Sequence, residues 1–76
     1  MTKSVFSSAY RELRRTLIAA RRRTGLTQAE LAARLDRPQS YVSKYERGER
    51  RIDLVEFLEI LTATKADAGA VVARLC

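Results

Sequence analysis

Four breaks in the helical periodicity divide the sequence into five short segments. The breaks lie at Gly25, at Asp36–Pro38, at Gly48 and at residues 62–67. Between the breaks, apolar side chains recur every three or four residues, which is the spacing of one helix face, and the alternation typical of strands is missing. The sequence therefore predicts an all-α chain: a compact bundle of about five helices forming a single domain over residues 1–76.

Local signals place the helix ends. Thr27 followed by Glu30, and Asp53 followed by Glu56, are capping boxes, in which each side chain accepts a hydrogen bond from the other residue's backbone N–H. Pro38 disfavours helical geometry at the residue before it. The expected helices run from Ser7 or Ser8, either of which can cap, to Arg23, from Thr27 to about Leu35, from Gln39 to Arg47, from Asp53 onward, and from Asp67 to Leu75. Phe6 is expected to staple the first helix against Tyr10.

Each expected helix carries one apolar face, and these faces form the expected core. Its members are Tyr10, Leu13, Leu17 and Ala20; Ala29, Leu31, Ala32 and Leu35; Val42 and Tyr45; and Leu54, Phe57, Leu58 and Leu61. The apolar residues of the last helix are Val71, Val72 and Leu75. A core of this size rarely supplies more than about 3–5 kcal/mol. Close helix packing or an oligomer must therefore stabilise the chain.

The composition argues against an enzyme and against a metal site. Cys76 is the only cysteine, so no internal disulfide can form, and there is no histidine. Structural zinc usually takes about four Cys or His ligands. A Ser or Cys nucleophile has no His base here, and no Gly-rich phosphate loop is visible. We therefore expect no enzymatic activity, no metal and no cofactor.

The same features predict a cytoplasmic protein. A single unpaired cysteine suits a reducing compartment. No run of about 18 apolar residues is present that could span a membrane. Met1–Phe6 lacks the apolar stretch and the cleavage site of a signal peptide.

Basic residues are concentrated in the first two-thirds of the chain. Residues 1–51 carry a net charge of +8, whereas residues 52–76 carry −2. This asymmetry favours a surface for a polyanion on one side of the molecule. Charge alone leaves open that the arginines and lysines only solvate exposed helix faces.

The second and third helices favour nucleic acid as that polyanion. Each has about eight residues, and the three-residue turn Asp36–Pro38 joins them. Two short helices joined so tightly must cross steeply, which is helix-turn-helix geometry. The major groove of DNA is about 12 Å wide and admits one helix.

Two segments of the chain resemble the phage repressor and Cro-like (XRE-type) helix-turn-helix family. They are Thr27-Gln28-Ala29-Glu30-Leu31-Ala32 and Ser40–Arg51, and the similarity covers roughly Leu17–Leu61. It implies a lambda repressor-like fold and sequence-specific binding of double-stranded DNA by a transcriptional regulator, with the helix-turn-helix pair at about residues 27–47. The chain departs from the family at Asp36, where glycine is usual, and at Arg37-Pro38, where an apolar residue and a hydroxyl cap are usual.

The resemblance also implies roles for individual residues. Base contacts are expected from Gln39, Ser40, Ser43 and Lys44, and phosphate contacts from Gln28, Tyr41, Arg47, Arg50 and Arg51. Gln28 is also expected to buttress the third helix. Glu46 and Arg21 are expected to form a structural ion pair that orients the third helix. Other roles stay open: Gln28 and Glu46 as solvated side chains and Gln39 as a turn cap. Lys44 can reach guanine or only a phosphate, and Tyr41 can lie against a thymine methyl group or simply cover the turn. We expect Arg11, Arg14 and Arg15 to lie too far from the groove.

One helix-turn-helix unit contacts one half-site, so we expect a homodimer, and a repressor on a near-palindromic operator, although an activator fits equally. Residues 62–76 are the candidate dimerisation segment, with Leu61, Val71, Val72 and Leu75 either at the interface or in the monomer's core. A phage-type repressor, a restriction–modification controller and an antitoxin that also binds a toxin all fit the chain. A basic amphipathic helix on a membrane surface is a remote alternative, because the first helix lacks Trp and needs its apolar face for the core.

Overall fold

The structure is a computed structural model and describes residues 8–75, which form five α-helices and no strand. The helices are α1 (Ser8–Arg23), α2 (Gln28–Arg34), α3 (Gln39–Arg47), α4 (Leu54–Ala63) and α5 (Ala68–Leu75). The all-α prediction is thus confirmed, with helix ends within one or two residues of those expected. The predicted cap at Ser7 and the staple from Phe6 lie outside the described residues.

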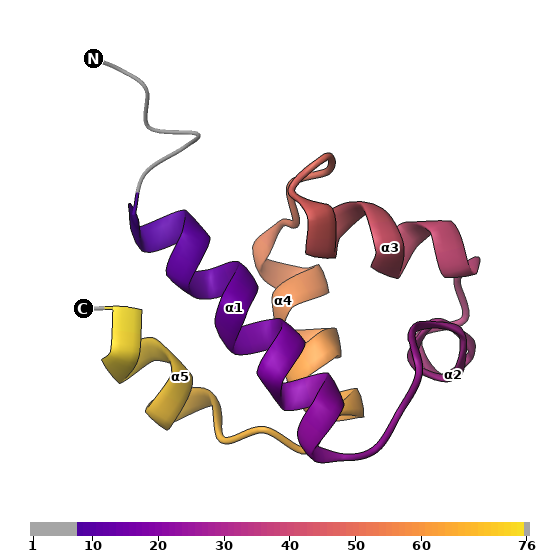
Figure 1. Cartoon of the computed structure of the whole chain (residues 1–76). Coiled ribbons are helices and arrows are strands. Elements are labelled where there is room, and N and C mark those ends of the chain that lie inside the picture. Colours follow the sequence, from indigo (N-terminus) through magenta and orange to yellow (C-terminus); the bar gives the residue numbers. More distant parts are fainter. Residues whose placement is uncertain (1–7, 76) are drawn as a thin grey trace.

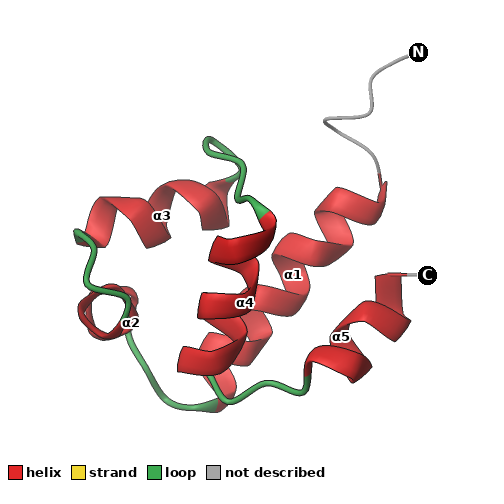
Figure 2. Cartoon of the chain, turned by 180° about the vertical axis from the view of Figure 1, so that it is seen from behind, coloured by secondary structure: helices red, strands yellow, loops and turns green. Residues whose placement is uncertain are grey.

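Helix α1 is the centre of the arrangement. It contacts α3, α4 and α5, whereas α2 contacts mainly α3. Figures 1 and 2 show α5 beside α1 on one side of the molecule and the α2–α3 pair on the other. In Figure 1, α2 is viewed along its axis and α3 from the side, so the two helices cross steeply. This is the helix-turn-helix arrangement.

The turn between α2 and α3 is built by residue types that suit its conformation. Asp36 has a φ of 59°, the left-handed conformation that Asp tolerates better than most residues. Pro38 stands at the N-cap of α3 with extended geometry and provides no side-chain hydrogen bond. The hydroxyl cap that is usual in the family is therefore absent, and the first turn of α3 has no side-chain cap for its backbone N–H groups.

The core lies where α1, α2, α3 and α4 meet. Its most enclosed members are Leu17, Leu31, Val42, Tyr45 and Ile60, none more than 1% exposed. The predicted inward pair of α3, Val42 and Tyr45, is confirmed. Val71 of α5 closes the core from the side of α1, and it is 6% exposed.

Helix α4 buries only part of the face expected. Leu61 is buried and Phe57 packs against the core as predicted, but Leu54 and Leu58 are 70% and 47% exposed, and Ile60 is buried in their place. Apolar residues surround most of this helix, so its periodicity allows two faces, and packing against the other helices selects one. The prediction was also wrong for Ala29, which is exposed. Val72, for which an interface and the core had both stayed open, is exposed as well.

Within residues 8–75, no helix combines the length and the apolar character that crossing a membrane requires. The same residues contain no group of three or more Cys, Asp or Glu side chains that could hold a metal ion.

Candidate nucleic-acid interface

Helix α3 presents a polar face to solvent. Val42 and Tyr45 point into the core, whereas Gln39, Ser40 and Lys44 are exposed. These three residues, which we call the reading face, begin at the first turn of the helix. The side chains expected to contact bases are therefore accessible, and the core fixes the helix behind them.

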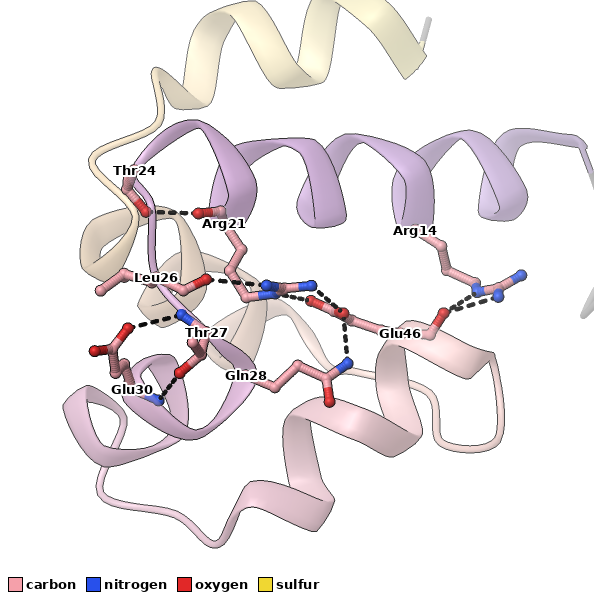
Figure 3. Close-up of polar contacts among 8 residues, drawn as sticks. All are labelled: Arg14, Arg21, Thr24, Leu26, Thr27, Gln28, Glu30 and Glu46. Atoms are coloured by element: carbon pink, nitrogen blue, oxygen red, sulfur yellow. Dashed lines mark hydrogen bonds and ion pairs between the residues drawn. The ribbon is translucent and has the colours of Figure 1, made fainter.

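A buried carboxylate fixes the other end of α3. Arg21 of α1 donates from Nε to Oε2 of Glu46 at 2.8 Å and from Nη2 to Oε1 at 3.0 Å (Figure 3). Gln28 of α2 donates from Nε2 to Oε1 at 2.9 Å. The Arg21 and Glu46 side chains are only 11% and 5% exposed. The hydrogen bond to Glu46 raises the pKa of Arg21. The expected ion pair is present and joins α3 to α1. The hydrogen bond from Gln28 joins the same carboxylate to α2.

Gln28 therefore braces α3 in the structure. It lies at the N-terminus of α2 behind the capping box that the sequence predicted. Glu30 N donates to Thr27 Oγ1 at 3.0 Å, and Thr27 N donates to Glu30 Oε1 at 2.8 Å (Figure 3). Arg21 also donates from Nη1 to the Leu26 carbonyl at 2.9 Å, which fixes the loop before α2.

Arg14 has a role that sequence reasoning missed. Its Nη2 and Nε donate to the Glu46 carbonyl at 2.8 and 3.3 Å (Figure 3). The last carbonyls of a helix lack intrahelical partners and carry partial negative charge, so a guanidinium satisfies and stabilises them. A signal was present: Arg14 and Arg21 are seven residues apart and so lie on one face of α1.

Gly48 ends α3 in the left-handed conformation, with a φ of 82°. A Cβ atom at this position would lie 3.1 Å from Cζ of Arg14. The glycine thus serves both the helix end and the close approach of the arginine.

Tyr41 is a correction to the expected site. Its side chain is 6% exposed, and its hydroxyl is buried without a hydrogen-bond partner among residues 8–75. The ring lies between the guanidinium groups of Arg37 and Arg50, 4.8 and 4.7 Å from its centroid, and packs edge-on against Tyr45. Burial raises the pKa of Tyr41. Tyr41 therefore supports arginines rather than reaching a phosphate itself, close to the alternative of a cover over the turn.

The arginines after α3 differ in how far their charge is compensated. Arg47 forms two hydrogen bonds with Glu49, both 3.0 Å, and donates to the half-buried Ser43 hydroxyl. Arg50 forms two with Glu56, at 3.1 and 3.0 Å. Arg51 instead lies over the Tyr10 ring, 4.6 Å from its centroid.

Arg51 is exposed and forms no ion pair with a described carboxylate, and the same is true of Lys44. Of the expected contact residues, these two carry the cations most available to DNA. Helical spacing places Ser43 and Arg47 on the same side of α3 as the reading face, and these two side chains are engaged with each other.

Comparison with known proteins places these features in context. A family model described as "Helix-turn-helix domain" matches residues 12–75. Among solved structures, an XRE-family like protein from Pseudomonas syringae pv. tomato str. DC3000 is similar, with 46% sequence identity and a TM-score of 0.85. The similarity covers 90% of this chain and 83% of that chain. No curated protein matches the chain.

Proposed function

The chain belongs to the XRE-type helix-turn-helix family of DNA-binding regulators, and from this premise we propose that it represses transcription as a twofold dimer on a near-palindromic operator. In this proposal each copy inserts α3 into the major groove of one half-site. The protein acts in the cytoplasm on the nucleoid, needs no cofactor and has no catalytic activity.

The observation that carries the proposal is the accessible reading face on a helix fixed at its far end. Gln39 suits a bidentate pair with adenine, and Lys44 suits guanine. Ser40 can pair with several bases, and Ser43 is a marginal contact. Specificity in the proposal comes from these base contacts.

Affinity comes mainly from phosphate contacts. Arg51 supplies the main phosphate contact because no described carboxylate pairs with its guanidinium. Arg50 and Arg47 contribute less because each is already paired with a carboxylate. Gln28 contributes through its place at a helix N-terminus, where backbone N–H groups favour an anion.

Selection of bound sites from random double-stranded DNA, followed by affinity measurements over a range of salt concentrations, tests the proposal. Gln39→Ala and Lys44→Ala are expected to change base preference or cost about 1–3 kcal/mol. Arg51→Ala should weaken all sequences alike and reduce the salt slope by about one. Arg15→Ala is the matched control, since Arg15 is 74% exposed on α1 and its removal changes the net charge equally. Equal effects of Arg51→Ala and Arg15→Ala would contradict the assignment.

The dimer part of the proposal keeps only some of the expected residues. Leu61 and Val71 are 2% and 6% exposed within one chain, so they belong to the monomer's core. Val72 is 47% exposed and Leu75 half-buried, and these two remain as candidates within residues 62–76. Sedimentation with and without operator DNA tests this part. We expect Val72→Asp to abolish the dimer. A wild-type protein that binds a full operator as a monomer would refute the dimer part of the proposal.

A further inference from the structure

Helix α4 leaves a large apolar surface uncovered. Leu54, Val55 and Leu58 are 70%, 65% and 47% exposed. Single exposed apolar residues are common on soluble proteins, but a contiguous group marks an interaction site more often. None of the three belongs to the reading face or to the phosphate contacts, so DNA binding does not account for them.

Two of these residues line a groove between the end of α2 and the outer face of α4. The groove has a volume of about 520 Å³ and is lined by Arg34, Leu35, Val55, Leu58, Glu59, Thr62, Ala63 and Lys65. On α4 the lining positions recur every three or four residues, so they form one continuous helix face. An apolar floor of this shape suits the apolar face of a second helix.

The rim of the groove is positively charged. The side chains of Arg34 and Lys65 form no ion pair or hydrogen bond with another described residue. The one carboxylate of the groove, on Glu59, accepts a hydrogen bond from Arg37 at 3.1 Å. Two free cations therefore flank an apolar floor, and the local acid is already compensated.

Lys65 also occupies an unusual backbone position. Its φ is 56°, a left-handed conformation that glycine adopts without a steric cost and other residues adopt at roughly 1–2 kcal/mol. The conformation belongs to the end of α4: Lys65 N donates to the Thr62 carbonyl at 3.2 Å, and Ala66 N donates to the Leu61 carbonyl at 2.9 Å. This is the Schellman pattern of helix ends, and it places the Lys65 side chain at the rim of the groove.

We propose that this groove binds an acidic amphipathic helix of a partner protein. Apolar side chains of that helix, spaced by three or four residues, would lie against Val55 and Leu58. Its carboxylates would pair with Arg34 and Lys65. The site goes beyond DNA binding and is built from none of the residues assigned to it.

A second copy of the chain does not supply such a helix. The sequence has nine Asp and Glu residues. Eight of them already accept hydrogen bonds or form ion pairs within the chain, which leaves only Asp36, in the turn after α2. The eight are Glu12, Glu30, Glu46, Glu49, Asp53, Glu56, Glu59 and Asp67. The net charge of +6 also attracts an acidic partner.

Fluorescence anisotropy with the full chain tests the proposal. The probe is a labelled helical peptide of about 15 residues, long enough for marginal helicity, with Leu at every third or fourth position and Glu between. The acidic peptide should bind, and more weakly as salt rises. A peptide with Lys in place of Glu should not bind. We expect Leu58→Asp to weaken binding at least about tenfold, and Arg34→Glu with Lys65→Glu about five- to thirtyfold. Arg15→Glu with Arg22→Glu makes the same charge change on α1 and should leave binding unchanged.

Val72→Asp is the second control, because Val72 and Leu58 are equally exposed, at 47%. Val72→Asp should weaken the proposed dimer and leave peptide binding intact. Leu58→Asp should weaken peptide binding and leave the dimer intact. Leu58→Asp should also retain DNA binding, which would show that this variant is folded. Equal binding of both peptides, or of the two charge-reversed proteins, would overturn the proposal. Self-association of the wild type that Leu58→Asp abolishes would show that the groove instead takes a second copy.

Discussion

Replacing Glu46 with alanine should destabilise the domain more than any other single change of a charged side chain. The carboxylate is 5% exposed and accepts two hydrogen bonds from Arg21 and one from Gln28. The Arg21 side chain is only 11% exposed in the structure, and removal of the Glu46 carboxylate leaves its guanidinium with only the Leu26 carbonyl as partner. Breaking a buried ion pair by removing one partner costs about 3–5 kcal/mol.

That cost is as large as the whole stability that a core of this size supplies, roughly 3–5 kcal/mol. Circular dichroism should therefore show that Glu46→Ala is mostly unfolded without urea. If it still folds, thermal unfolding should show a melting temperature at least about 12 °C below that of the wild type, since each kcal/mol shifts the melting temperature by about 4–8 °C. Glu46→Gln keeps the shape of the side chain and one acceptor oxygen. Its stability should therefore lie between that of the wild type and that of Glu46→Ala.

Glu49→Ala is the matched control. Glu49 and Arg47 have the same two-bond geometry, with both distances 3.0 Å, but their side chains are 56% and 55% exposed. An exposed pair contributes about 0–1 kcal/mol. If Glu46→Ala and Glu49→Ala cost the same free energy of unfolding, burial is not what makes the Glu46 contacts important, and the reasoning fails.

Two further predictions concern the segment after α3. Gly48→Ala should cost about 1–2 kcal/mol for the left-handed backbone, plus the displacement of Arg14, whereas Gly25→Ala, with a similar φ of 78° and open space around its Cβ, should cost the backbone part alone. Equal losses in the two urea titrations would contradict this role of Arg14. Hydrogen bonding to Arg50 lowers the pKa of Glu56 below its usual 4.5. The pair therefore adds stability above about pH 4.5 and loses it as the pH falls through the lowered pKa, and Glu56→Gln should flatten this acid dependence of the free energy of unfolding.

The helix limits and caps could be predicted because their causes are local. The pairs Thr27–Glu30 and Asp53–Glu56 act over three residues, and both capping boxes are present. Asp36 likewise adopts the left-handed conformation that its short polar side chain tolerates.

What the sequence predicted poorly depends on contacts between distant segments. Leu54 and Leu58 of α4 were predicted to be buried and Ile60 was not, since only the packing of α4 against the other helices decides which side of the helix is covered. Tyr41 was expected at the surface because the two arginines that contact its ring, Arg37 and Arg50, lie in the segments before and after α3 rather than on the helix itself. The spacing of four residues between Tyr41 and Tyr45 was a signal for its burial, but contacts with residues outside the helix cannot be predicted from helical periodicity.

Three side chains from two helices tie the end of α3 to its surroundings, and this has a consequence for how DNA is met. The backbone of α3 is already ordered before DNA binds. Binding therefore reduces the conformational entropy chiefly of the few exposed side chains. A helix held in this way has little freedom to adapt its tilt to an imperfect groove. The duplex must bend or twist instead, so base steps that the protein never touches should influence affinity through their stiffness.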